Sequence, residues 1–254
     1  MSRYRKPLAL RPSPGAAVPE VAMVMAAGLG KRMRPLTATR PKPLIEVAGK
    51  PLIDHALARL RAAGVRKAVV NVHYLADAVE AHLGHRDHGL ETIVSDERSC
   101  LLETGGGIAR ALPMIDADPF LAVNSDNLWV DGPVDALKLL AADWDDARMD
   151  ALLLLVPLAR AHCHLGRGDF HMNAAGLLKR KRPGGVAPFV FTGIQMLSKR
   201  FFAGELPEGP FSINPLWDRA IAAGRCFGAV HQGLWFDVGQ PQSIKKAEEI
   251  LRAG

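Results

Sequence analysis

The stretch Ala26–Pro43 combines the residue types that a phosphate-binding site needs. It reads AAGLGKRMRPLTATRPKP and follows a short apolar run, Val21–Met25. Glycine permits positive φ and a close backbone approach, so consecutive amide groups in such a turn can point at phosphate oxygens. The candidate nucleotide-binding residues in the turn are Ala27, Gly28, Leu29, Gly30 and Lys31, and further basic side chains follow at Arg32, Arg34, Arg40 and Lys42. The segment predicts a polyphosphate site.

Two common phosphate-binding motifs do not fit this stretch. The Walker loop needs glycine at position 25 and serine or threonine at position 32, where this chain has Met25 and Arg32. A dinucleotide fingerprint would use Gly28 and Gly30, but Met33 replaces its third glycine. The prolines that follow would also break the long helix that this fingerprint requires. A dinucleotide-dependent oxidoreductase is therefore kept only as an alternative.

Positive charge is concentrated near the start of the chain. The net charge is +6 at pH 7, and residues 21–50 alone hold six basic residues and one acidic residue, whereas residues 51–254 carry a net charge of −2. A surface that binds nucleic acid would spread its basic residues more widely. The distribution favours a compact polyanionic ligand and predicts no nucleic-acid partner.

A carboxylate follows the apolar run Phe120–Asn124, at Asp126. In open α/β sheets, ligands bind beyond the carboxyl ends of the strands. Magnesium prefers oxygen ligands, commonly one or two carboxylates together with substrate phosphates. Asp126 is therefore a candidate Mg²⁺ ligand, although aspartate at a strand end is also a common turn former.

A triple glycine, Gly105–Gly107, leads into the expected helix Gly107–Leu112, whose apolar pattern begins at Ile108. A flat nucleotide base can lie directly against such a backbone, whose amide and carbonyl groups can recognise its edge. The candidate residues for this contact are Glu103, Thr104 and Gly105, and the alternative is a plain loop that leads into the helix.

The segment His162-Cys163-His164 could suggest a soft metal site, but no second cysteine cluster completes one. We therefore interpret these histidines as loop or solvent-facing residues. The chain has three cysteines, widely scattered and without CxxC spacing, so no disulfide framework is encoded and a cytoplasmic location is favoured.

Short apolar strands alternate with helical patterns over the first part of the chain. The expected strands are Val21–Met25, Ala68–His73, Glu91–Ser95, Phe120–Asn124 and Ala151–Val156, and the expected helices include Asp54–Ala63, Ala76–Leu83 and Val134–Ala142. This alternation implies right-handed crossovers. We predict an α/β fold with a Rossmann-like, mixed, mostly parallel sheet and helices on both faces. Hairpin-like strands, including Phe189–Leu197, are expected to extend the sheet, followed by helices at Ser212–Ala223 and Gln242–Leu251.

Composition indicates a folded globular chain. Of 254 residues, 48% are hydrophobic and 23% are charged, which is close to the average for such proteins. Without repeats or linkers, residues 21–254 are expected to form a single domain, and residues 1–20 a flexible N-terminal extension. The longest uncharged apolar stretch, Val21–Gly30, is far shorter than the roughly 18 residues of a membrane helix, so no membrane association is expected.

Over about residues 21–250 the sequence resembles the sugar-1-phosphate nucleotidyltransferases. The family pattern AAGxGxRMxPLT followed by PKPL is matched by AAGLGKRMRPLT and Arg40–Leu44, and its W-x-D-x-G segment by Trp235–Gly239. The resemblance implies that Arg32 stabilises charge at the reacting phosphorus and that Lys42 lies near the α-phosphate. It also implies that Asp126 and Asp237 bind Mg²⁺.

The same resemblance places a sugar pocket in the middle of the chain. The residues that it implies are Asn124, Gly168, Asp169, Thr192 and Gly193. Many family members carry a Glu-Lys pair in this region, and no such pair is found here. The basic run Lys179–Arg182 is interpreted as an exposed hairpin.

The segments LETGGG and GRGDF resemble a subgroup of uridylyltransferases that act on N-acetylmuramic acid 1-phosphate in cell-wall recycling. The implied reaction is in-line attack of a sugar 1-phosphate on the α-phosphorus of a nucleoside triphosphate, with UTP favoured and pyrophosphate released. A guanylyltransferase for mannose or heptose 1-phosphate, and a noncatalytic relative that senses nucleotides, are the alternatives. The sequence does not determine the oligomeric state.

Overall fold

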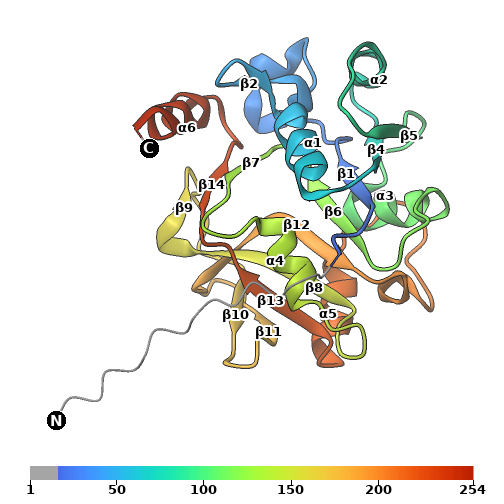
Figure 1. Cartoon of the computed structure of the whole chain (residues 1–254), viewed down its shortest axis with the longest axis vertical. Coiled ribbons are helices and arrows are strands. Elements are labelled where there is room, and N and C mark those ends of the chain that lie inside the picture. The colour runs from blue at the N-terminus through green and yellow to red at the C-terminus, as the bar shows by residue number, and fades with distance from the viewer. Residues whose placement is uncertain (1–16, 254) are drawn as a thin grey trace.

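The computed structural model describes residues 17–253 and is built around a nine-stranded sheet (Figure 1). Its strands are β1 (Val21–Met25), β4 (Lys67–Val72), β5 (Glu91–Asp96), β6 (Phe120–Asn124), β8 (Ala151–Pro157), β10 (Phe170–Met172), β11 (Leu178–Arg180), β12 (Phe189–Leu197) and β13 (Cys226–Val230). The order is β11-β10-β12-β6-β1-β4-β5, with β8 beside β12 and β13 beside β8. Only β12 and β11 run against the other strands of this sheet, which confirms the predicted mixed, mostly parallel sheet.

The apolar strands of the predicted core lie at the centre of the sheet. β1 pairs in parallel with β4 on one side and with β6 on the other. Its residues Val21, Ala22, Met23 and Val24 are all buried. A continuous apolar run is typical of a parallel strand that is covered on both faces. The carboxyl ends of β1, β4 and β6 therefore meet at one edge of the sheet.

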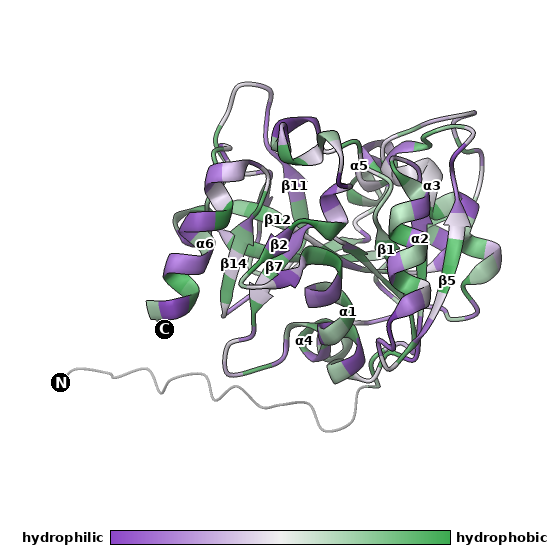
Figure 2. Ribbon diagram, turned by 90° about the horizontal axis from the view of Figure 1, so that it is seen from above, coloured by the Kyte–Doolittle hydropathy of each residue, from purple (hydrophilic) through white to green (hydrophobic). Residues whose placement is uncertain are grey.

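Helices cover both faces, as predicted. They are α1 (Leu52–Ala63), α2 (Ala76–His85), α3 (Glu103–Ala111), α4 (Ala136–Asp143), α5 (Asn214–Ala222) and α6 (Pro241–Ala253). Residues of α1, α2 and α4, such as Leu57, Val79 and Leu137, belong to one hydrophobic cluster, and α3 and α5 contribute Ile108 and Trp217 to the other. In Figure 2 the hydrophobic colour follows the central strands, whereas α6 alternates between hydrophobic and hydrophilic residues.

A second, three-stranded sheet joins the C-terminal part of the chain to the turn after β6. Its order is β7 (Asn127–Val130), β14 (Leu234–Asp237) and β9 (Ala161–His162). A third hydrophobic cluster, which includes Met33, Leu128 and Phe236, lies beside it and contains Ala247 of α6. A short hairpin, β2 (Glu46–Val47) and β3 (Lys50–Pro51), precedes α1.

Short 3₁₀ helices complete the described elements. They are η1 (Lys31–Met33), η2 (Leu36–Ala38), η3 (Lys42–Leu44), η4 (Leu112–Met114), η5 (Leu158–Arg160) and η6 (Lys199–Phe202). Three of them fall in the basic segment that follows the glycine turn, where the frequent prolines prevent a long helix. This segment is thus a series of short turns rather than the helix of a dinucleotide fold.

Two expectations about element boundaries need correction. α3 begins at Glu103, so the triple glycine lies inside the helix and not in a loop before it. β7 and β13 were not expected. The predicted N-terminal extension lies mostly outside the described residues, although the carbonyl of Glu20 accepts hydrogen bonds from the amides of Arg66 and Lys67.

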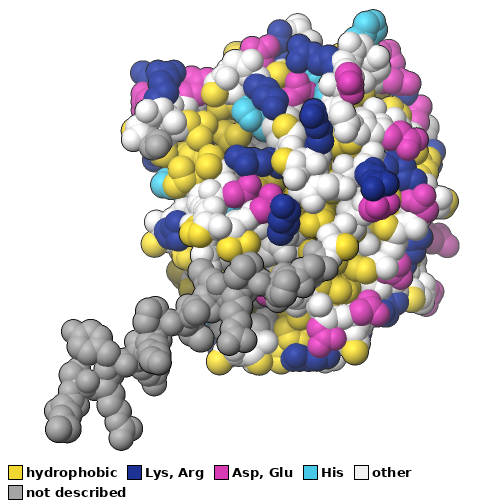
Figure 3. Space-filling view, viewed as in Figure 1, with side chains coloured by type: hydrophobic (Ala, Val, Ile, Leu, Met, Phe, Trp, Pro, Cys, Tyr) yellow, Lys and Arg dark blue, Asp and Glu magenta, His cyan; other side chains and the backbone are white. Residues whose placement is uncertain are grey.

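On the face shown in Figure 3, basic and acidic side chains are intermixed with hydrophobic ones. Within residues 17–253, none of the helices combines the length and the apolar character that a bilayer crossing requires.

Candidate active site

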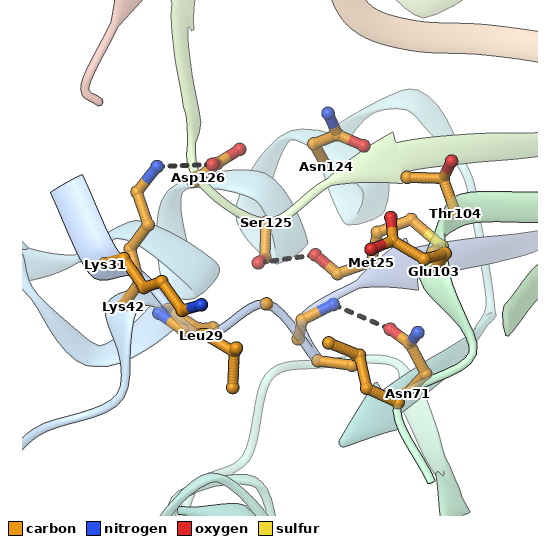
Figure 4. Close-up of a pocket in the computed structure, with 15 residues that line it drawn as sticks. Met25, Leu29, Lys31, Lys42, Asn71, Glu103, Thr104, Asn124, Ser125 and Asp126 are labelled. Atoms are coloured by element: carbon orange, nitrogen blue, oxygen red, sulfur yellow. Dashed lines mark hydrogen bonds and ion pairs between the residues drawn. The ribbon is translucent and has the colours of Figure 1, made fainter. Parts of the chain in front are cut away.

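A cavity of about 380 Å³ opens where the carboxyl ends of β1 and β6 meet (Figure 4). Its size is within the usual range for small-molecule sites. The predicted nucleotide-site residues Ala27, Gly28, Leu29, Lys31, Glu103 and Thr104 line this cavity, together with Lys42, Asn124 and Asp126. An adjoining cavity shares Gly28, Lys31, Lys42 and Asp126 and adds Gly30, Arg32, Met33 and Gly239. The fold therefore assembles most of the predicted residues around one opening.

The glycine turn is held by specific contacts at both of its ends. The Ala26 amide donates to Asn71 Oδ1 at 2.7 Å, and the Thr37 hydroxyl donates to the Gly30 carbonyl at 2.8 Å. Gly30 has a φ of +60°, and a Cβ there would lie 2.9 Å from Thr37 Cγ2. Gly28 has open space on its Cβ side. This combination leaves the middle of the turn accessible to a ligand while its ends stay fixed.

Lys42 lies inside the site rather than in bulk water. It is flanked by Pro41 and Pro43, its side chain is 11% exposed, and its Nζ lies 2.5 Å from Oδ2 of Asp126. The two side chains point toward one another in Figure 4. The proline-restricted backbone lowers the entropy lost on positioning a long side chain. Lys42 thus places an ammonium group directly beside the carboxylate at the strand end.

The second predicted carboxylate lies at the same edge. Asn127, which follows Asp126, pairs with Asp237 across β7 and β14. Arg32 packs against Gly239 on the other side, because a Cβ on Gly239 would lie 3.2 Å from Arg32 Nη1. The structure therefore brings Arg32, Lys42, Asp126 and Asp237 together from three separate segments of the chain.

His164 lies in the loop after β9, as expected, but its side chain contacts Asp237 and does not face solvent. Its Nδ1 lies 3.1 Å from Asp237 Oδ2, and its side chain is 15% exposed. Because a carboxylate only accepts hydrogen bonds, Nδ1 carries the proton and donates it. Burial alone would raise the pKa of Asp237, but the His164 hydrogen bond and the charges of Arg32 and Lys42 hold it below the ordinary value. Asp237 is thereby kept ionised and able to bind a cation.

A buried polar network behind the turn was not identified from the sequence. Asn71 Nδ2 donates to Glu97 Oε1 at 2.8 Å, and Glu97 Oε2 accepts from the Leu102 amide at 3.1 Å. Both Asn71 and Glu97 are 1% exposed. The available signal was a polar residue close to the end of a strand: Asn71 is next to the last residue of β4, and Glu97 directly follows β5. The network connects the glycine turn to the segment that begins α3.

The triple glycine provides close packing at the start of α3. A Cβ on Gly105 would lie 2.5 Å from the Phe211 ring, and its amide donates to the Phe211 carbonyl. A Cβ on Gly107 would lie 2.8 Å from Glu97 Oε1. Gly105 is buried and does not line the cavity, whereas Glu103 and Thr104 do.

The residues predicted to bind the sugar do not all lie at the cavity. Asn124 lines the cavity, and Gly193, with a φ of +79°, approaches so closely that a Cβ there would overlap Asn127 Nδ2 and lie 2.7 Å from Asn124 Nδ2. Thr192 is fully buried and its hydroxyl donates to the Leu154 carbonyl, so its side chain does not line the cavity. Gly168 packs against the Ala187 carbonyl.

Asp169 lines a separate cavity, which we call the basic cavity. Its Oδ2 accepts from the Phe191 amide at 2.9 Å. Arg180, Lys181 and Arg182 line the same cavity, so the basic run interpreted as a plain exposed hairpin contributes to a concave surface. Arg180 Nη1 contacts Asn214 Oδ1 at 2.7 Å. Asn214 begins α5, and the amide of the preceding residue, Ile213, donates to Thr104 Oγ1. Because Thr104 lines the first cavity, the basic cavity flanks it.

Known proteins resemble this chain in sequence and in fold. Residues 21–162 match the nucleotidyl transferase family. The chain is 48% identical over 236 residues to the N-acetylmuramate alpha-1-phosphate uridylyltransferase of Caulobacter vibrioides, a match that covers 92% of this chain and 97% of that protein. It is 36% identical over 233 residues to the Neisseria meningitidis serogroup B protein of the same name, with coverages of 91% and 98%.

Solved structures show the same fold at lower identity. The inositol-1-phosphate CTP transferase from T. maritima superposes with a TM-score of 0.75 at 20% identity, covering 92% of this chain and 96% of that one. The chain therefore belongs to the nucleotidyl transferase family, as its resemblance to the sugar-1-phosphate nucleotidyltransferases predicted.

Proposed function

We propose that this protein transfers the uridylyl group of UTP to N-acetylmuramic acid 1-phosphate, and that residues 21–254 act as a single catalytic domain. The observation that carries the proposal is the convergence of Lys42, Asp126 and Asp237 beside the glycine turn, in a chain 48% and 36% identical to two N-acetylmuramate alpha-1-phosphate uridylyltransferases. In the cytoplasm, such an enzyme would return a cell-wall sugar to nucleotide-sugar biosynthesis.

The triphosphate would lie over the glycine turn. The amides from Ala27 to Lys31 point hydrogen-bond donors at its oxygens, and Lys31 and Arg32 supply positive charge. Lys42 lies at the far side of the turn, beside Asp126. A ligand held there presents its α-phosphorus between the turn and the strand ends.

The reaction needs no general base. An oxygen of the sugar phosphate, already anionic near neutral pH, attacks the α-phosphorus. The bond from this phosphorus to its β-bridging oxygen breaks, and pyrophosphate leaves with both electrons of that bond. Arg32 and Lys42 stabilise the negative charge that accumulates at the α-phosphoryl group. This chain's own residues thus supply positioning and charge stabilisation for the step.

The carboxylates fit a divalent cation. Asp126 and Asp237 offer the hard oxygen donors that Mg²⁺ prefers, and the His164 hydrogen bond orients Asp237. A bound Mg²⁺ would offset charge on the phosphate oxygens. Asp126 and Asp237 are the residues that would hold it.

The sugar would lie toward Asn124 and Gly193, with its lactyl group directed to the basic cavity. N-acetylmuramic acid differs from N-acetylglucosamine by an ether-linked group that ends in a carboxylate. Lys181 and Arg182 line the basic cavity and offer cations for this carboxylate. The same residues would have no partner on a neutral sugar.

Pyrophosphate release tests the proposal directly. The purified protein with Mg²⁺ is assayed with UTP, GTP, CTP and dTTP, each against N-acetylmuramic acid, glucosamine, mannose and heptose 1-phosphates. Release with UTP and N-acetylmuramic acid 1-phosphate, well above every other pair, is expected. A preference for GTP with mannose or heptose 1-phosphate would establish guanylyl transfer instead, and binding of UTP without any release would indicate a nucleotide sensor.

A further inference from the structure

Three side chains with metal-ligating groups converge between α1 and α2, away from the catalytic cavity. Asp54, His82 and His88 each offer one ligand atom, and these atoms all lie within 4.8 Å of one another. Within residues 17–253 no other group of three or more histidine, cysteine or acidic side chains meets this condition. Asp54 and His88 line a cavity that shares no residue with the two catalytic cavities.

Asp54 is the centre of this cluster. It lies in the first turn of α1 with its side chain 7% exposed. His82 Nε2 lies 2.6 Å from Asp54 Oδ1, and His88 Nδ1 lies 3.9 Å from the same oxygen. The His82 side chain is 12% exposed and that of His88 is 7% exposed. Two imidazoles from different segments thus approach one buried carboxylate oxygen.

Hydrogen bonding alone explains only part of the arrangement. The pair of Asp54 and His82 is satisfied as a hydrogen bond. His88 is not satisfied in this way, because its Nε2 is buried without a hydrogen-bond partner in the described structure and its Nδ1 is beyond hydrogen-bond distance of Asp54. Burial of a polar nitrogen without a partner costs free energy. A metal ion would bind Nδ1, the nitrogen that faces Asp54, and would give that side of the ring a partner.

The donor set selects the class of ligand. One carboxylate and two imidazoles suit Zn²⁺ and similar transition metals, whereas Mg²⁺ prefers oxygen donors alone. In a tetrahedral zinc site, neighbouring ligand atoms lie about 3.3 Å apart, given bonds of about 2.0–2.1 Å. The separations of 2.6 Å and 3.9 Å lie on either side of that value. The two histidine nitrogens lie within 4.8 Å of each other. Side-chain adjustments on the order of 1 Å would complete three-ligand coordination and leave a fourth position for water.

The positively charged side chain of Arg86, at the rim of this cluster, would compete with a metal ion for Asp54. Arg86 Nη1 lies 3.0 Å from Asp54 Oδ2, the oxygen that neither histidine contacts. The Arg86 side chain is 58% exposed, so it can turn into solvent. Its charge opposes a metal ion on the same carboxylate. Removal of this charge should therefore tighten metal binding.

We propose that Asp54, His82 and His88 form a second divalent-metal site, selective for Zn²⁺ over Mg²⁺ and separate from the catalytic carboxylates. A metal ion there connects α1, α2 and the loop that holds His88. α1 follows the β2–β3 hairpin, and the Leu52 amide at its start donates to the Ile45 carbonyl just after the η3 turn that carries Lys42. Zinc binding would therefore stabilise the start of α1, which is hydrogen-bonded to the segment that follows Lys42.

The experiment titrates the EDTA-treated full-length protein with Zn²⁺ in excess Mg²⁺ by calorimetry, with thermal unfolding as a second readout. Co²⁺ is used in parallel, because tetrahedral coordination gives it strong visible absorption. One equivalent of Zn²⁺ and a higher Tm are expected. His88→Gln, which keeps the pair of Asp54 and His82, should weaken Zn²⁺ binding by at least about 100-fold, as should His82→Gln.

Matched variants make the outcome decisive. His85→Gln changes an exposed histidine on α2 and should bind Zn²⁺ as the wild type does. Arg86→Gln should bind Zn²⁺ about tenfold more tightly, from the loss of one repulsive charge. The variant with Asp126→Asn and Asp237→Asn should keep the Zn²⁺ site. No binding at micromolar Zn²⁺, binding unchanged in both His82→Gln and His88→Gln, or binding lost with the catalytic carboxylates would each overturn the proposal.

Discussion

Asn127 and Asp237 lie opposite one another in the antiparallel pair of β7 and β14. Asp126 directly precedes Asn127, and its Oδ2 lies 2.5 Å from Lys42 Nζ. This strand pair therefore places both carboxylates near the lysine of the basic segment. His164, beside β9 at the other edge of the small sheet, adds a hydrogen bond to Asp237. The small sheet therefore positions the candidate metal ligands, while the large sheet positions the glycine turn.

Replacement of Lys42 by methionine should mainly lower kcat. Its ammonium lies inside the site, and loss of one preorganised donor to a developing charge typically costs on the order of 100-fold to 1,000-fold in rate. Steady-state pyrophosphate release measures the effect. Lys31→Met is the matched control, because Lys31 is exposed on the same turn and should mainly raise KM for UTP. A Lys42→Met enzyme with near-normal kcat would contradict the assigned role.

Replacement of Asp126 or Asp237 by asparagine should raise the Mg²⁺ concentration needed for half-maximal activity by at least about tenfold. Each change removes one negative ligand and keeps the side-chain shape. Activity is titrated with Mg²⁺ at fixed UTP, and chelation by EDTA should abolish it. Asp131→Asn, which affects an ion pair with Arg59, should leave the Mg²⁺ dependence unchanged. An unchanged Mg²⁺ titration for both site variants would rule out the carboxylate assignment.

Replacement of His164 by alanine should shift the Mg²⁺ dependence in the same direction, by about 10-fold to 100-fold, because outer hydrogen bonds orient ligating carboxylates. His164→Asn should recover part of the loss, since its amide can donate from nearly the position of Nδ1. His162→Ala is the control, because His162 stacks on Phe236 and does not contact Asp237 through a hydrogen bond in the described structure. If asparagine gave no more activity than alanine, a packing role alone would explain His164.

Replacement of Gly193 by alanine should destabilise the fold by about 2 kcal/mol or more and also reduce activity. The added Cβ would overlap Asn127, and a positive φ of +79° is strained for any other residue. Gly184→Ala shares a positive φ of +74° but has open space, so it should cost only about 1 kcal/mol. Denaturant unfolding compares the two. Equal costs would mean that close approach to Asn127 is unimportant.

Replacement of both Lys181 and Arg182 by glutamine should raise KM for N-acetylmuramic acid 1-phosphate by about tenfold, because one charge-assisted contact is lost. N-acetylglucosamine 1-phosphate lacks the lactyl carboxylate, so any turnover of this sugar should be unaffected. The ratio of kcat/KM for the two sugars is the measurement. An equal decrease for both sugars would show that the basic cavity does not recognise the carboxylate.

Local sequence signals identified much of the fold. β1, β6 and β12 have the predicted bounds, because each is mostly buried and rich in apolar residues, a pattern that needs no tertiary information. β7 and β13 were missed, since β7 has only four residues and Gly228 interrupts the apolar residues of β13. The start of α3 was misplaced because glycine usually disfavours a helix interior, and here close packing against Phe211 and Glu97 leaves no room for larger side chains.

The sequence by itself determined the chemistry available to this protein: a glycine turn for phosphates, a basic segment beside it, and carboxylates at Asp126 and Asp237. The tertiary structure decided which of these groups meet. It brings Lys42 into contact with Asp126 and His164 into contact with Asp237, and it buries Thr192 and Gly105 in packing contacts. The reason is physical: residue type and local periodicity report on backbone conformation and burial, whereas contacts between distant segments depend on strand pairing and close packing, which no local pattern encodes.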